Sequence, residues 1–163
     1  MFERIEKLPS EVKTKLLNNE TIRKLMINDN NNALNMAVPP KEKVVDYITT
    51  HPVYQIENKE NYQQNGMINI YVTTGEPDDE ELIIYGVLRI NIAYNVDKWD
   101  LVDNKCRPMS IANEVIKLLK DCKFSISNKL DFASLDELIV SKQLVGYTLL
   151  FNITDGSGNL TNF

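Results

Sequence analysis

The spacing of apolar residues changes along the chain, from a helical period in the first part to a strand period further on. Apolar side chains recur every three or four positions over residues 10–17 and 20–27, which predicts two short helices, the second with Asn19 as a suitable N-cap. Residues 41–50 have the spacing of one more short helix. Residues 1–50 are therefore predicted to form a helical N-terminal part.

From residue 67 onward apolar and polar side chains alternate, as is typical of half-buried strands. This alternation predicts strands at residues 67–73, 82–95, 125–132 and 144–154. Ser134 and Glu137 have the spacing of a capping box, which favours a helical turn near residues 135–139. Ile139 and Val140 are equally suited to begin the last strand, so both interpretations stay open.

The clearest helix is predicted over residues 109–123, directly after Pro108, which suits a first helical turn. Its apolar face is formed by Ile111, Val115, Leu118, Leu119 and Cys122. We expect this helix to pack on a sheet. The predicted fold class is α+β, with a mixed or antiparallel sheet, one long amphipathic helix on a face and short helices at the N-terminus. Residues 1–163 would form a single domain whose sheet-plus-helix core spans residues 67–154.

Composition limits the classes of partner. The 163 residues carry a formal net charge of −5, which argues against a general binder of nucleic acid or of anionic membranes. No apolar stretch approaches the roughly 20 residues that cross a bilayer, so no membrane partner is expected. The N-terminal residues lack the apolar run of a secretory signal, and we expect the protein to be made and kept in a cytoplasm.

No pattern of reactive residues predicts an enzyme. His51 is the single histidine and has no nucleophile motif beside it. Cys106 and Cys122 are too widely spaced for a zinc knuckle and are expected to be free thiols. The glycines in residues 155–159 precede no helix, and the acidic residues 76–81 lack the ordered spacing of a calcium loop. We therefore predict no catalytic, cofactor-binding or metal site; an enzyme that uses carboxylate pairs without histidine is the weaker alternative.

The order of the predicted elements resembles a family of phage structural proteins. The segments that carry the likeness are residues 67–73 (MINIYVT), 86–95 (GVLRINIAYN), 111–119 (IANEVIKLL) and 145–151 (VGYTLLF). They resemble the strand, long strand, helix and glycine-tyrosine return strand of tail terminator and tail-completion proteins, or head-to-tail connectors, of tailed bacteriophages. The likeness covers residues 67–154 and is a pattern of elements.

The resemblance implies a structural virion protein with no enzymatic activity and no cofactor. It implies a homo-oligomeric ring of six or twelve copies at the phage neck or tail end, which joins the tail to the portal complex and is assembled in the host cell cytoplasm. Its partners would be further copies of itself and neighbouring neck, portal or tail-tube proteins, with DNA only as passing cargo.

Four consecutive acidic residues are the first candidates for an interface or for the lumen of such a ring: Asp78, Asp79, Glu80 and Glu81. The alternative, from a different functional class, is a small cytosolic adaptor or regulatory module that binds one protein partner.

Overall fold

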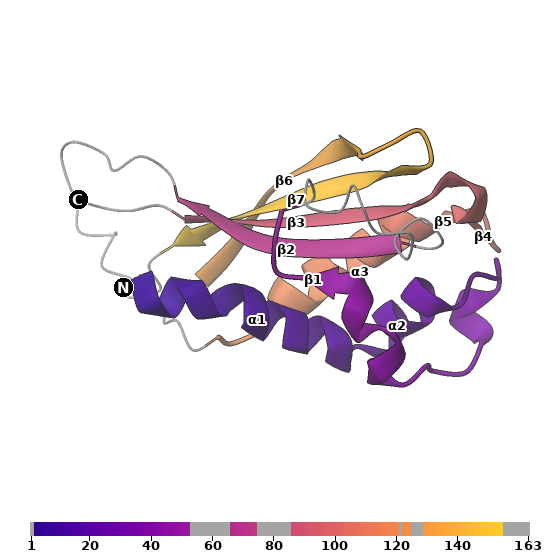
Figure 1. The fold of residues 1–163 in the computed structure, drawn as a ribbon, viewed down its shortest axis with the longest axis horizontal. Coiled ribbons are helices and arrows are strands. Elements are labelled where there is room, and N and C mark those ends of the chain that lie inside the picture. Colours follow the sequence, from indigo (N-terminus) through magenta and orange to yellow (C-terminus); the bar gives the residue numbers. More distant parts are fainter. Residues whose placement is uncertain (1, 53–65, 75–85, 121, 125–128, 155–163) are drawn as a thin grey trace.

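The computed structural model describes residues 2–52, 66–74, 86–120, 122–124 and 129–154. In this part of the chain a five-stranded sheet has the order β1-β2-β3-β7-β6, and helices α1, α2 and α3 lie on one side of it (Figure 1). The strands are β1 (Ile48–Thr49), β2 (Gly66–Thr74), β3 (Gly86–Asn95), β6 (Lys129–Ile139) and β7 (Leu144–Thr154). β1 is parallel to β2, whereas the other neighbours are antiparallel. The sheet is mixed and the predicted α+β class is confirmed.

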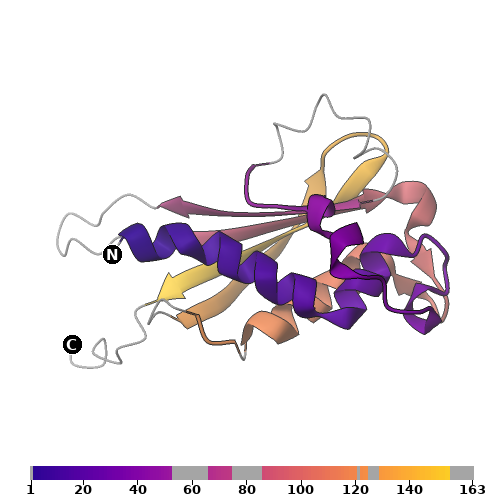
Figure 2. The same cartoon turned by 60° about the horizontal axis from the view of Figure 1, so that its bottom comes forward.

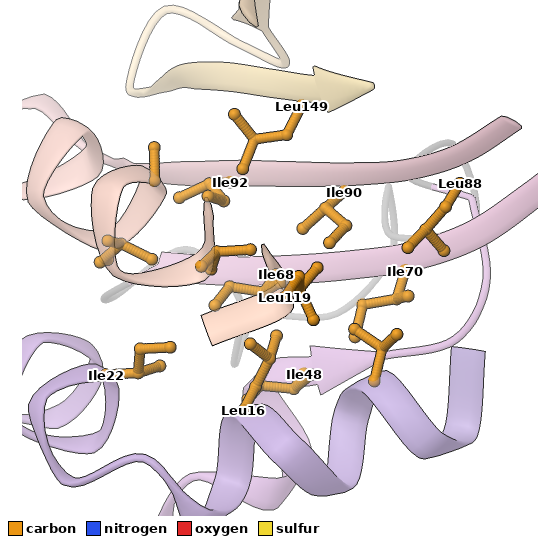
Figure 3. Packing of buried hydrophobic residues seen from close by; sticks show 14 of the residues in the cluster. Leu16, Ile22, Ile48, Ile68, Ile70, Leu88, Ile90, Ile92, Leu119 and Leu149 are labelled. Atoms are coloured by element: carbon orange, nitrogen blue, oxygen red, sulfur yellow. The ribbon is translucent and has the colours of Figure 1, made fainter. Parts of the chain in front are cut away.

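Alternation along the strands places one set of apolar side chains on the helical side of the sheet. Ile70, Ile90, Leu149 and Leu135 occupy directly opposed positions on β2, β3, β7 and β6. The first three are fully buried, and they meet side chains of the helices and of β1 in one continuous core (Figure 3). Burial of this apolar face is the main favourable term in folding.

The N-terminal helix is longer than the sequence pattern predicts. α1 (Phe2–Asn18) includes Pro9, where the expected helix began only at residue 10. A proline inside a helix removes one hydrogen bond and crowds the preceding turn. Here Ile5, Leu8, Val12 and Leu16 form one buried stripe that crosses the position of the proline. Packing of this stripe against the sheet offsets the lost hydrogen bond, so the prediction of only short helices before the sheet was wrong.

Two further helices complete the layer (Figure 2). α2 (Glu20–Ile27) has the predicted bounds, and the Asn19 side chain accepts a 2.9 Å hydrogen bond from the Ile22 amide as its N-cap. α3 (Arg107–Lys120) is the helix that was expected at 109–123 and contacts β3 and β7. The structure thus has two substantial helices on the same face, α1 and α3, where one long helix was predicted.

Two predicted helical segments adopt other conformations. Residues 41–50 form the 3-10 turns η2 (Lys41–Lys43) and η3 (Val45–Tyr47) and then β1, because Ile48 joins the sheet beside Ile68. The capping-box spacing at Ser134 and Glu137 is part of β6, where pairing with β7 provides the backbone hydrogen bonds that a helical turn would have supplied. The helical interpretation of residues 135–139 was wrong.

The remaining strand predictions agree with the structure where they can be compared. β7 has the predicted bounds, and β2 is one residue longer at each end than expected. The expected strands at 82–95 and 125–132 correspond to β3 and to the start of β6; residues 82–85 and 125–128 lie outside the described part. After β3, the turn η6 (Val96–Lys98) leads to a small hairpin, β4 (Asp100–Leu101) and β5 (Lys105–Cys106).

Replacing Leu119 by Ala should destabilise the fold by roughly 2–5 kcal/mol, because its side chain is fully buried between α3 and the sheet. Leu118 is the matched control on the same helix: it is only partly buried, and its replacement should cost clearly less. Urea unfolding of both variants measures the two free energies. Equal and small losses would contradict the packing of α3 on the sheet.

Candidate functional site

The reactive side chains considered in the sequence do not gather into a chemical site. Among the described residues, no three His, Cys, Asp or Glu side chains are placed to hold a metal ion. His51 is exposed, and Cys106 and Cys122 are free, partly exposed thiols as expected. None of the described helices is long and apolar enough to cross a membrane. The residues expected at an interface or lumen, Asp78, Asp79, Glu80 and Glu81, lie outside the described part of the chain.

A buried arginine joins the helical layer to the sheet. Arg107 is fully buried at the start of α3, and its Nη1 donates hydrogen bonds of 2.6 Å and 2.8 Å to the carbonyls of Leu25 and Asn28. Its Nη2 donates to the Asn30 carbonyl at 3.0 Å, and its Nε to the Lys98 carbonyl at 2.8 Å. The guanidinium therefore satisfies carbonyls at and beyond the end of α2, where a helix leaves them unpaired.

Tyr94 forms the sheet side of this contact. Its ring lies under the Arg107 guanidinium, 4.8 Å from the centroid, and its hydroxyl donates to the Met26 carbonyl at 3.1 Å. Asp29 lies 3.4 Å from the same hydroxyl and pairs with Lys98 at 2.7 Å. We refer to Arg107, Tyr94, Asp29 and Lys98 as the Arg107 clamp. The clamp binds backbone and neighbouring side chains, so its role is structural.

Two tyrosines, Tyr94 and Tyr147, have raised pKa values. Burial raises the pKa of Tyr94 above its ordinary value; the nearby Arg107 charge opposes this shift, and Asp29 adds to it. Burial also raises the pKa of Tyr147, with smaller contributions from Cys106 and Glu137. Both hydroxyls are therefore protonated at neutral pH and act as neutral groups.

The side of the sheet away from the helices has a polar row. Thr49, Asn69, Asn91 and Thr148 are directly opposed on β1, β2, β3 and β7. The Asn69 amide donates to the Thr49 hydroxyl at 2.5 Å, and the Thr148 hydroxyl donates to Asn91 Oδ1 at 2.8 Å. Asn69 is buried, and its Oδ1 has no hydrogen-bond partner among the described residues. The alternation over residues 67–73 predicts the strand, but which polar residues of other strands lie opposite Asn69 follows only from the sheet order.

The outer edge of β6 is the most distinctive surface. β6 ends the sheet order, so one side of its 11-residue backbone has no neighbouring strand among the described residues. On the helical side of the sheet, Phe132 is 45% exposed and Ile139 is 75% exposed. The register shifts by one residue between Phe132 and Ser134, as in a β-bulge at Ala133. An exposed edge with large apolar side chains is suited to pairing with another chain.

Acidic side chains line the other side of β6. Asp131, Ser134 and Asp136 alternate with the apolar residues, and the Ser134 hydroxyl donates to Asp136 Oδ2 at 3.3 Å. Lys129 pairs with Asp131 at 3.1 Å. Charged residues on an edge strand oppose indiscriminate pairing. The edge therefore carries exposed apolar side chains, which favour contact, together with acidic side chains on both sides of the sheet, Asp136 on one and Glu137 on the other, which restrict the partner.

The opposite edge of the sheet is partly open. β1 pairs only with Ile68 and Asn69 of β2, and no described strand lies beside residues 70–74 on that side. We call these five residues the free edge of β2. Tyr71 and Thr73 point away from the helices, and Val72 points toward them. The two edges of the sheet thus differ in length and in charge.

Comparison with known proteins identifies a family. Residues 19–153 match the family model described as YomW, which covers α2, α3 and nearly all of the sheet. Neither the curated proteins nor the solved structures include a match to the chain.

Replacing Arg107 by Ala should cost at least about 3 kcal/mol, because several buried carbonyls lose their donor at once. Arg89→Ala is the matched control: Arg89 is half-buried and makes a 3.3 Å hydrogen bond to Thr73, so its removal should cost within about 1 kcal/mol. Denaturant unfolding of both variants tests the difference. Similar values for the two would show that the clamp contributes little to the fold.

Proposed function

Because the chain belongs to the YomW family, a phage-derived family, we propose that it is a structural protein of the virion that assembles into a homo-oligomeric ring. The ring has six or twelve copies and lies at the phage neck or tail end, as a tail terminator or head-tail connector. It joins the tail to the portal complex, and its neighbours are neck, portal or tail-tube proteins. The subunits assemble in the cytoplasm of the host cell.

The observation that supports a ring is the pair of unlike sheet edges. A ring closes through head-to-tail contacts, for which each subunit needs two different complementary surfaces. The outer edge of β6 exposes Phe132 and Ile139, and the free edge of β2 lies at the other end of the same sheet.

The charge of the chain is consistent with DNA as passing cargo. A net charge of −5 disfavours binding to phosphate, so DNA can move through a ring without adhering to it. Within this proposal, the acidic residues 78–81 face the lumen or a neighbouring subunit. They hold no cofactor and carry out no reaction.

Replacing Asp78, Asp79, Glu80 and Glu81 by Asn and Gln should leave the free energy of unfolding of the subunit within about 0.5 kcal/mol of the parent value. The same variant should retard DNA passage or loosen subunit contacts, which is measured as fewer infectious particles in a complementation assay. Loss of folding would mean that these residues are structural. Full infectivity would exclude a lumen or interface role.

The mass of the protein in solution tests the ring directly. Light scattering of the purified chain, alone and after addition of lysate from infected cells, should reveal a species of six or twelve subunits, and electron microscopy should show it as a ring or at the neck of particles. A persistent monomer or dimer that is absent from particles would contradict the proposal. That outcome would favour the alternative, a small adaptor or regulatory module with one protein partner.

A further inference from the structure

We propose that the outer edge of β6 in one subunit pairs with the free edge of β2 in the next, so that a single sheet continues from subunit to subunit. This inference rests on the proposed ring and names the surfaces that close it. The partner of each edge is a second copy of the same chain.

Exposure of the β6 edge shows that it is incomplete in the single subunit. Ile139 is 75% exposed although it belongs to a strand of the central sheet, and Phe132 is 45% exposed although it contacts Phe151 with a centroid distance of 5.5 Å. A strand added beside residues 135–139 of β6 would cover Ile139 from the helical side, whereas Phe132 lies beyond the bulge at Ala133. The added strand would also satisfy the outward backbone groups of the edge.

Charge disfavours the central pairing of β6 with β6 of a second copy. Consider two β6 strands that pair antiparallel about a two-fold axis, with the helical sides of both sheets facing the same way. If the axis passes near the centre of residues 134–139, Asp136 lies opposite Asp136 of the second copy, or Glu137 lies opposite Glu137. Like charges that lie directly opposite each other destabilise a strand pair. The free edge of β2 contains no charged residue, and the nearest charge behind it is the cation Arg89. The two unlike edges are therefore the compatible pair.

Strand direction also agrees with this pairing. β2 and β7 run in one direction, and β3 and β6 run in the other. When subunits repeat head to tail along the sheet, the β2 strand of the next subunit lies antiparallel to β6. The helical sides of both sheets then face the same way, so Ile139 of β6 lies on the same side as Ile70 and Val72 of the next β2, and the exposed Glu137 of β6 also lies on that side.

Lengths and side chains favour one register. With Asp136 opposite Thr73, Leu138 lies opposite Tyr71 and Ile139 lies opposite Ile70. β6 then ends where β1 begins to occupy β2, at Asn69, so the two strands do not collide. The Asp136 carboxylate meets the Thr73 hydroxyl, which already accepts a 3.3 Å hydrogen bond from Arg89 Nε. The hydroxyl can donate its proton to the carboxylate, and the guanidinium places a positive charge next to it.

Cysteine crosslinking tests this contact in the full chain. The background is the Cys106→Ser, Cys122→Ser variant, provided that it forms the same oligomer as the parent protein. In this background we make Asp136→Cys alone, Thr73→Cys alone and the two together. Directly opposed residues of antiparallel strands have Cα separations that a disulfide spans. Oxidation of the double variant should give a ladder of covalent multimers that ends at the ring size. Each single variant should give no covalent dimer, whereas co-production of the two singles with different tags should give a mixed dimer.

The outcomes test the β6–β2 contact separately from the formation of the ring. A ring that forms without the mixed dimer overturns the β6–β2 contact and leaves the proposed function standing. A covalent dimer from Asp136→Cys alone overturns it in favour of paired β6 strands. Absence of any oligomer, alone or in particles, overturns both proposals.

Charge reversal supplies a second measurement that needs no crosslink. Asp136→Lys should raise the protein concentration needed for half assembly at least tenfold, because a lysine replaces the acceptor beside Thr73 and Arg89. Asp97→Lys makes the same change of charge at an exposed position outside both edges and should shift this concentration less than twofold. Equal behaviour of the two variants would contradict the proposed register.

Discussion

The buried guanidinium of Arg107 is the interaction on which the arrangement of the helices depends. It caps the carbonyl end of α2, stacks on Tyr94 of β3 and begins α3, whose first amide donates to the Trp99 carbonyl at 2.7 Å. A buried charge is costly unless its donors are satisfied, and here backbone carbonyls and an aromatic ring share the charge. Parts of the chain about 80 residues apart are thereby fixed at one side chain. The contact fixes α2 and α3 relative to β3 on the side of the sheet where the apolar residues of the strands lie.

This one-sided arrangement determines where another chain can bind. The described α-helices occupy the apolar side of the sheet, so the other side carries the polar row of Thr49, Asn69, Asn91 and Thr148. The apolar residues on that side, Met67, Ala93 and Leu144, are buried in a second small cluster, so this face exposes little apolar area to a partner. The apolar area that stays exposed on strands lies at β6, in Phe132 and Ile139. Assembly through an edge is therefore the contact that this fold favours.

The sequence predicted the elements best where local signals and packing agree. α2 and β7 have the expected bounds, because capping by Asn19 and strict alternation over residues 144–154 each indicate one structure. Local rules failed where tertiary contacts outweigh them: Pro9 is held inside α1 by the buried stripe around it, and the capping-box spacing at 134–137 lies in a strand. The clamp could not be predicted from the sequence, because nothing in the pattern around Arg107 distinguishes it from an exposed polar residue. Its burial depends on carbonyls that only the fold brings near.

The two edges of the sheet could not be predicted from periodicity either, because the alternation of apolar and polar residues does not specify the order of the strands. The strand order shows that the acidic residues of β6 lie on an edge strand, where charge opposes pairing with other chains. Asp131 and Asp136 keep the edge from pairing with copies of itself, and the bulge at Ala133 interrupts the regular edge between Phe132 and Ser134. These features protect a free subunit from aggregation, yet they do not oppose an uncharged strand such as residues 70–74. In the ring that we propose, a subunit built in this way would remain separate from wrong partners and would still be complementary to the next copy.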